Sequence, residues 1–310
     1  MKGKLANPRV ILFIGAFCVS MSSLLIRSSN APALVSATFR QIWTVLLLTP
    51  FVLRNNWAEW KALARKDLLF CILSGLLLAL HFATWFQAAK TTSVANATVL
   101  VCTEVIFSAL GYAFILRGRI PKLGIIAMGI TFVGAAMIAL ASQQSGSNWR
   151  GDVLALVAAI LVAAYTLVGR RQRRYMSTSL YTYLTYVSCT FFLLLLDLAT
   201  GTTLKGWGAR ELGIGLLLCI FCTLLGHNIF SWCLKYLDPV FVSASKLTEP
   251  IYATAIATVL FQEIPRLQQI FGGVLVIGGI LLYTYTEGSA TTKQLGIKEQ
   301  ATGKEIERIV

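Results

Sequence analysis

The stretch LLFCILSGLLLALHFATWFQAA, Leu68–Ala89, runs for 22 residues without an Asp, Glu, Lys or Arg. A helix needs about 20 mostly apolar residues to cross the hydrocarbon core of a bilayer. The run is continuous, whereas a strand of a membrane β-barrel alternates apolar and polar residues over about half this length. The stretch therefore predicts a transmembrane helix.

Nine further segments have a similar length and apolar character. Together with Leu68–Ala89 they predict an all-α integral membrane protein with ten transmembrane helices. The ten segments are Val10–Ile26, Ala33–Leu53, Leu68–Ala89, Ser93–Leu116, Lys122–Ala141, Gly151–Val168, Leu180–Ala199, Leu212–Tyr236, Pro239–Gln262 and Pro265–Tyr285.

The composition of the whole chain excludes several classes of protein. Of 310 residues, 56% are hydrophobic and only 13% are charged, and the mean hydropathy is +0.72. Soluble proteins carry about 25% charged residues, and a soluble fold of this length could not bury so much apolar surface. A cytosolic enzyme, a nucleic-acid-binding domain and a disordered scaffold are excluded. The seven cysteines are scattered through apolar segments and do not form a secreted disulfide framework.

The net charge of +14 is distributed unevenly between the two sides of the membrane. Of the 27 Lys and Arg residues, 19 lie on the side of the N-terminus, six lie on the other side, and only Arg40 and Lys246 lie within predicted helices. The positive-inside rule therefore predicts a multi-pass plasma-membrane protein with both termini in the cytoplasm. The basic run Arg170–Arg174 is expected to contact anionic lipid headgroups and not nucleic acid.

The two halves of the chain resemble each other. Thr103–Glu104 recurs 145 residues later as Thr248–Glu249, and His81 recurs 146 residues later as His227. We expect a first repeat at residues 8–141, a polar linker at 142–150, a second repeat at 151–285 and a polar cytoplasmic tail at 286–310.

The number of helices in each half has a mechanical consequence. With five helices per half, the two halves begin on opposite sides of the membrane and are inverted copies of each other. Inverted repeats suit alternating access, because exchanging the conformations of the halves converts an inward-open state into an outward-open one. The architecture therefore predicts a transporter.

Several motifs together carry a resemblance to a known family. They are Arg40, Thr248–Pro250, Glu263 with Gly272–Gly273, and the opening of the sixth segment, Gly151–Leu156, with Tyr165 and Arg170–Arg171. On these residues the chain resembles an EamA-type member of the drug/metabolite transporter superfamily, over residues 8–285. The resemblance implies a ten-helix bundle with a central cavity and the transport, often export, of small organic solutes. Val105 stands where the second repeat has Pro250, so a hinge-forming proline is expected only in the ninth helix.

Ionisable residues within the predicted helices are candidates for substrate binding. A charge at the centre of a membrane helix costs about 2.5–3.5 kcal/mol on insertion scales, and such residues usually face a cavity. Lys246 and Glu249 are three residues apart and share a helix face, so a structural ion pair is one interpretation. In the other, Lys246 or Arg40 binds an anionic group such as a carboxylate. Glu249 or Glu104 then binds an amine or a proton.

Histidine and aromatic residues complete the candidate set. His81 and His227 are either internal hydrogen-bonding residues or cavity-facing groups. Trp85, Asn228 and Trp232 lie close to them along the chain, and aromatic rings beside polar groups occur both in solute pockets and in ordinary packing. The candidate substrate-binding residues are Arg40, His81, Trp85, Glu104, His227, Asn228, Trp232, Lys246 and Glu249. No cofactor or metal is expected, because ligands at the required spacing are missing from the sequence.

These features predict a secondary transporter, not an enzyme, that exports small organic metabolites such as amino acids. The sequence has no nucleotide-binding motif, so the energy would come from the gradient of the substrate or of protons. The expected partners are a small organic solute and membrane lipid, with no nucleic acid. Two alternatives stay open: a membrane-embedded enzyme acting on lipid headgroups, and a non-transporting receptor.

Overall fold

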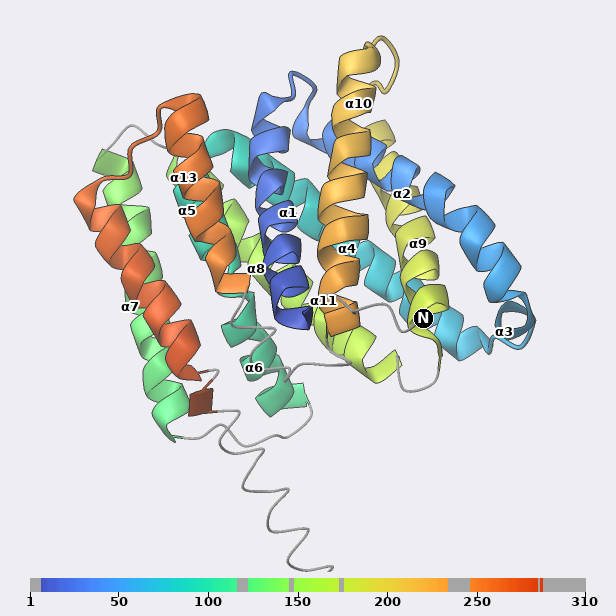
Figure 1. Ribbon diagram of the computed structural model, residues 1–310, viewed down its shortest axis with the longest axis horizontal. Coiled ribbons are helices and arrows are strands. Elements are labelled where there is room, and N and C mark those ends of the chain that lie inside the picture. The colour runs from blue at the N-terminus through green and yellow to red at the C-terminus, as the bar shows by residue number, and fades with distance from the viewer. Residues whose placement is uncertain are drawn as a thin grey trace, which may run out of the picture.

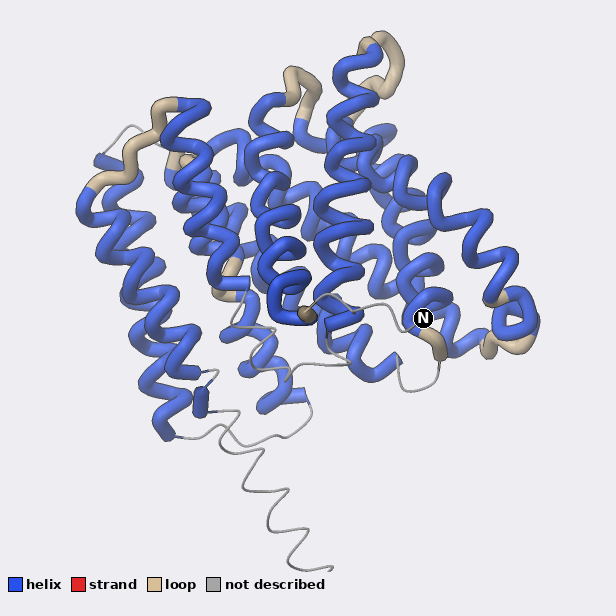
Figure 2. Tube along the Cα trace, in the orientation of Figure 1, coloured by secondary structure: helices blue, strands red, loops and turns tan. Residues whose placement is uncertain are grey.

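The computed structural model describes residues 7–115, 122–144, 148–172, 176–233, 246–283 and 285–286, and in these ranges every regular element is a helix (Figures 1 and 2). Three predicted features lie partly outside the described residues. They are the linker at 145–147, the basic run at 173–175, and the tail from residue 287 onwards.

Six helices in the described part of the chain are long and apolar enough to cross a membrane. They are α1 (Pro8–Ser28), α2 (Ala33–Asn55), α4 (Arg65–Thr91), α8 (Trp149–Gln172), α9 (Thr178–Ala199), and the continuous run of α10 (Ala209–Leu217), η1 (Leu218–His227) and α11 (Asn228–Cys233).

Shorter helices occupy the other four predicted segments. They are α5 (Val94–Val101) with α6 (Glu104–Ile115), α7 (Lys122–Gln144), η2 (Lys246–Thr248) with α13 (Glu249–Phe261), and the Leu267–Tyr283 helix. The short helix α3 (Trp57–Lys61) connects α2 to α4. The prediction of an all-α, multi-pass membrane fold is confirmed.

The outer faces of several helices are apolar, as lipid-facing surfaces must be. Ile125 and Val133 of α7 are more than half exposed, and so are Phe271 and Val274 of the neighbouring Leu267–Tyr283 helix. A continuous apolar surface of this kind is typical of contact with a membrane.

Glycines let these two helices approach closely. A Cβ atom added at Gly134 would lie 2.6 Å from the carbonyl oxygen of Gly272, which is closer than two such atoms can pack. Small residues at helix crossings serve the same purpose in other membrane proteins.

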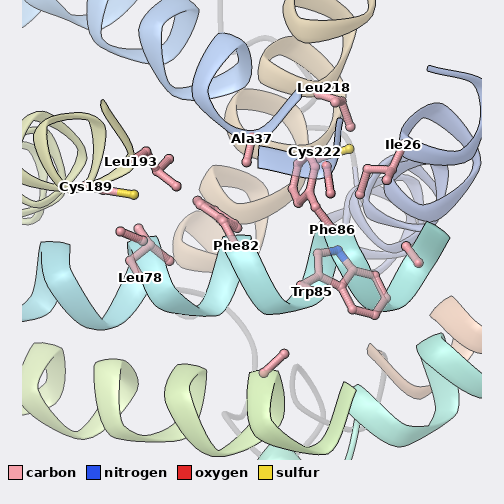
Figure 3. Packing of buried hydrophobic residues seen from close by; sticks show 14 of the residues in the cluster. Ile26, Ala37, Leu78, Phe82, Trp85, Phe86, Cys189, Leu193, Leu218 and Cys222 are labelled. Atoms are coloured by element: carbon pink, nitrogen blue, oxygen red, sulfur yellow. The ribbon is translucent and has the colours of Figure 1, made fainter. Parts of the chain in front are cut away.

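Helix α4 lies in the middle of the bundle and organises the largest apolar cluster (Figure 3). Phe82, Trp85 and Phe86 project from it into this cluster, and all three are at least 96% buried. The cluster also includes Ile26, Ala37, Cys189, Leu193, Leu218 and Cys222. His81 lies on the same helix, so this packing also fixes the position of His81 in the bundle.

One predicted helix differs from expectation because it is interrupted. The predicted helix Ser93–Leu116 ends at Val101 and begins again at Glu104, so α5 and α6 are separate. In the ninth segment, the described residues begin with the 3-10 turn η2, and α13 follows directly from Glu249. The fourth segment is therefore broken although Val105 stands where the ninth segment has Pro250.

Candidate functional site

The interruption between α5 and α6 and the start of α13 both fall at the repeated Thr-Glu pair. At the interruption, the backbone N–H and the hydroxyl of Thr103 both donate to the carbonyl oxygen of Leu100, at 3.1 and 2.6 Å. This i to i−3 pattern tightens the chain and ends α5, and a Thr hydroxyl that binds backbone favours such local turns. The pattern of apolar residues in the sequence gives no indication of this turn, and a continuous helix was therefore expected.

Pro250, the proline expected as a hinge, lies in the first turn of α13. At that position its missing N–H removes no helical hydrogen bond. It therefore helps α13 to begin at Glu249. In both halves, the first residue of the new helix is a glutamate, which the helix dipole favours at that end.

An ion pair joins the start of α6 to η2. Lys246 Nζ lies 3.4 Å from Glu104 Oε1, and it also lies 5.6 Å from the centre of the Phe230 ring. The side chains of Lys246 and Glu104 are 37% and 25% exposed, so the pair is not sealed by protein. The lysine therefore connects the ninth segment to the fourth.

Arg40 lies close to this pair but is bound differently. Its Nε donates to Thr223 Oγ1 at 3.1 Å, and its guanidinium carbon lies 4.5 Å from the centre of the Phe82 ring. Arg40 is only 2% exposed. Among the described residues, no carboxylate is in ion-pair contact with it.

Glu249 and His81 complete a cluster of charged and polar groups. Glu249 is partly exposed and interacts electrostatically with Lys246, Glu104 and Arg40. His81 interacts with Glu104 and Arg40, and its Nδ1 lies 2.8 Å from the carbonyl oxygen of Ala158. We call the group Arg40, Glu104, Lys246 and Glu249 the helix-break site.

Two further predicted residues, Trp85 and Asn228, lie outside this site. Trp85 is 4% exposed and packs in the apolar cluster around α4 (Figure 3). Asn228 is exposed at the start of α11. The backbones of His227 and Trp232 lie in η1 and α11, whereas their side chains lie outside what the structure describes.

Sequence reasoning missed Thr223, which holds the guanidinium of Arg40. Thr223 lies in η1, a π-helix of ten residues, and π-helical turns are rare and often occur at functional sites. A threonine in a run of Leu, Ile, Phe and Cys was a detectable polar exception. The π-helical geometry that aims it at α2 was not predictable from that run.

At one end of the bundle, at the top of Figure 1, polar contacts tie the two halves together. Glu263 Oε1 forms an ion pair with Arg27 Nη2, and Glu263 Oε2 accepts from the backbone N–H of Val94 at 3.0 Å. Arg27 also donates to the carbonyl oxygen of Thr92 at 3.0 Å. We call this region the Glu263 end.

The buried carboxylate of Asp152 strengthens the Glu263 end. It is 0% exposed and accepts from Thr92 Oγ1 at 2.6 Å and from Asn96 Nδ2 at 3.2 Å. Gln269 Nε2 in turn donates to Asn96 Oδ1 at 3.0 Å. These bonds link the start of α5 to α8 and to the Leu267–Tyr283 helix.

Glu59 of α3 holds the start of α9 at the opposite end. It accepts from the backbone N–H and the hydroxyl of Ser177, at 2.6 and 2.5 Å, and from Asn56 Nδ2 at 3.1 Å. Partial burial alone would raise the pKa of Glu59, but these hydrogen bonds outweigh it and hold the pKa below its ordinary value. Ser177 also caps α9 by accepting from the N–H of Leu180.

Comparisons with known proteins match nearly the whole chain. The sequence pattern of the EamA-like transporter family matches residues 9–140 and 149–285, once in each half. An uncharacterized transporter of Clostridium kluyveri is 24% identical over 258 residues, which cover 81% of this chain and 83% of the relative.

A second relative has a more specific name. The pseudopaline exporter CntI of Pseudomonas aeruginosa is 22% identical over 282 residues, covering 90% of this chain and 96% of the relative. A crystal structure that is 15% identical in sequence superposes with a TM-score of 0.59, over 90% of this chain and 97% of the other. At that identity, the superposition shows a shared fold alone.

Proposed function

The chain belongs to the EamA-like transporter family, and from this premise we propose that it is a secondary transporter exporting small organic metabolites such as amino acids. In this proposal, two inverted five-helix repeats alternate access to the helix-break site. The observation that carries the proposal is the Lys246–Glu104 ion pair, which joins the interruption between α5 and α6 in the first half to the η2–α13 start in the second half.

Interrupted helices are informative inside a membrane. Irregular backbone at membrane depth is tolerated only where it is buried in protein or lines a water-filled cavity. Many transporters bind substrate where discontinuous helices meet at the interface between repeats. The partial exposure of Lys246 and Glu104 supports a binding site at this place.

The repeat itself supports alternating access. Glu104 and Glu249 occupy equivalent positions in the sequence repeat, and each is the first residue of a helix, α6 and α13. If the two halves are inverted copies, these equivalent helix starts give each half the same point of flexibility. We propose residues 8–141 and 151–285 as the two repeats.

The orientation follows from the distribution of Lys and Arg residues. With both termini in the cytoplasm of a plasma-membrane protein, the Glu263 end faces away from the cytoplasm. The contacts of Glu263 and Asp152 then close the outer end of the bundle in this conformation. Release of an exported solute requires these contacts to separate.

The direction and the energy source are part of the same proposal. Similarity to a protein named as a pseudopaline exporter supports export. The energy is proposed to come from the substrate gradient or a proton gradient, with Glu249 as the group that would exchange a proton with the substrate site. Relatives named as transporters favour this function over an enzyme acting on lipid headgroups.

The proposal is tested by counterflow in proteoliposomes loaded with an unlabelled panel of amino acids, nucleosides and cationic drugs. We expect saturable uptake of at least one labelled compound into vesicles that contain the same compound. Binding without exchange for every class would contradict the proposal and support a receptor instead.

A further inference from the structure

We propose that Arg40 and Glu249 recognise the two ends of a zwitterionic substrate, Arg40 holding a carboxylate and Glu249 holding a protonated amine. The inference rests on the proposed transport function and deepens it, because it separates the four charges of the helix-break site into two pairs. Lys246 and Glu104 form the structural pair, and Arg40 and Glu249 form the recognition pair.

The first step is the Lys246–Glu104 contact. The two charges lie 3.4 Å apart and come from η2 and α6, so each neutralises the other while it holds the two segments together. Lys246 also faces the Phe230 ring at 5.6 Å, which leaves less of its ammonium group free. Of the two cations that could bind an anionic substrate group, Lys246 is therefore the one already occupied.

The second step is the state of Arg40. A guanidinium group has five N–H donors, and the structure shows one of them, on Nε, in a hydrogen bond to Thr223. The Phe82 ring covers one face of the guanidinium and therefore does not bind the N–H donors that point outward in its plane. The two outer nitrogens thus have no hydrogen-bond partner among the described residues. Arg40 is nevertheless buried, with only 2% of its surface exposed.

Such a state is costly unless a ligand completes it. A buried charge without a hydrogen-bonded counter-ion is strongly unfavourable, and guanidinium binds carboxylate through two parallel hydrogen bonds. Thr223 and Phe82 together fix the plane of the group, so that its two outer nitrogens are presented in a fixed direction. Arg40 is therefore prepared for a planar carboxylate, and Thr223 is a positioning residue.

The third step is Glu249, which has the opposite charge and is also without an ion-pair contact among the described residues. It interacts electrostatically with Arg40, and the two form no ion pair. A cation and an anion that both lack an ion-pair contact match a molecule with opposite charges at its two ends. An amino acid has this charge arrangement.

Access to Arg40 is consistent with alternating access. Glu249 is partly exposed, whereas Arg40 is buried between α2, α4 and η1. A solute that enters by way of Glu249 reaches the guanidinium only when these helices move apart. Binding of the carboxylate would then be coupled to the conformational change.

The test compares three probes in counterflow: L-leucine, leucine amide, which lacks the carboxylate, and N-acetyl-L-leucine, which lacks the basic amine. The wild-type protein should exchange leucine at least about tenfold faster than either analogue, since loss of one charged hydrogen-bonded group costs about that factor or more. Arg40→Gln should abolish the preference for leucine over the amide. Glu249→Gln should abolish the preference for leucine over the N-acetyl compound.

Two variants keep the test decisive if Arg40→Gln fails to fold. Thr223→Val preserves the shape of the side chain and the charge of Arg40 but removes the acceptor for Nε, and we expect a reduced preference for the carboxylate. Arg40→Lys retains the positive charge but lacks the two parallel N–H donors of a guanidinium group, and it should reduce the same preference. Arg210, which is exposed, and Glu59, which is partly buried at the opposite end of the bundle, provide charge-matched controls as Arg210→Gln and Glu59→Gln. Both preferences should persist in these variants.

The outcomes separate this inference from the proposed function. Exchange of a nucleoside or a drug but of none of the three leucine probes would overturn the inference and leave transport intact. Unchanged preferences in Arg40→Gln and Glu249→Gln would also overturn it. Failure of the folded wild-type protein to exchange any compound of the wider panel would overturn the transport function itself.

Discussion

The Glu263 end and the helix-break site use charged residues in opposite ways. At the Glu263 end, the carboxylates of Glu263 and Asp152 each accept hydrogen bonds from groups in the other half of the chain. At the helix-break site, Arg40 and Glu249 have no ion-pair contact among the described residues. Satisfied charges hold helices together, whereas unsatisfied charges indicate where a ligand is missing.

The difference matters because buried charges are expensive in both places. Two charges removed from water lose hydration free energy, and only good geometry and further hydrogen bonds compensate for that loss. At the Glu263 end, contacts within the protein provide this compensation. At the helix-break site they provide it only for Lys246 and Glu104, so two opposite charges remain that an external molecule can bind.

Reversing one charge at the helix-break site should have the largest effect. Lys246→Glu would place a third carboxylate beside Glu104 and Glu249, so the like charges would repel each other and Glu104 would lose its partner. We expect counterflow to fall by about 100-fold. The exchanged variant, Lys246→Glu with Glu104→Lys, should recover most of the rate. No recovery in a correctly folded double variant would mean that the two residues do not act as a pair.

Removing the buried carboxylate of the Glu263 end should affect stability before activity. Asp152→Ala leaves Thr92 and Asn96 with unsatisfied donors, at a cost of about 1–3 kcal/mol. We expect the Tm of the purified protein in detergent to fall by about 5 °C. Asn148→Ala, an exposed change at the same end, is the control and should leave the Tm unchanged. Equal Tm values for both variants would contradict the structural role of Asp152.

A milder change at the Glu263 end should favour its opening. Glu263→Gln keeps the shape of the side chain but weakens the ion pair with Arg27. Thr254 lines a small cavity beside Glu263, and the seven native cysteines are buried. We expect a membrane-impermeant maleimide to label Thr254→Cys about threefold faster when Glu263→Gln is present, as a shift of under 1 kcal/mol would produce. Unchanged labelling would show that Glu263 does not restrain this end.

The smallest effect is expected at Glu59, on the opposite end. Its pKa is lower in the folded protein than in the unfolded chain, so its contribution to stability is present above the ordinary pKa of glutamate. That contribution is lost as the pH falls through the folded pKa. The difference in Tm between wild type and Glu59→Gln should therefore be about 1 °C at pH 7 and should vanish near pH 3. A difference that grows toward low pH would contradict this sign.

Helix positions were predictable because membrane depth fixes the length of an apolar run. The predicted Ala33–Leu53 and Leu180–Ala199 correspond to α2 and α9 within two residues at each end. The interruption between α5 and α6 was not predictable from hydropathy. Thr103 ends α5 by hydrogen bonding to Leu100, a local geometry to which an average over apolar residues is insensitive.

The candidate site was predictable in composition but not in pairing. The cost of intramembrane charge singled out Arg40, Glu104, Lys246 and Glu249 before any contact was known. The three-residue spacing favoured contact between Lys246 and Glu249, but η2 ends between them, and Lys246 pairs with Glu104 instead. Contacts that span more than 140 residues depend on how the helices pack, and one sequence does not contain that information.

The central claim is that the helix-break site recognises and transports a zwitterion. Its most direct test is counterflow of labelled L-leucine and leucine amide by wild type and Arg40→Gln, reconstituted at equal density. The account predicts that wild type prefers leucine at least about tenfold and that Arg40→Gln transports both compounds at similar rates. A folded Arg40→Gln protein that still prefers leucine as strongly as wild type would contradict it.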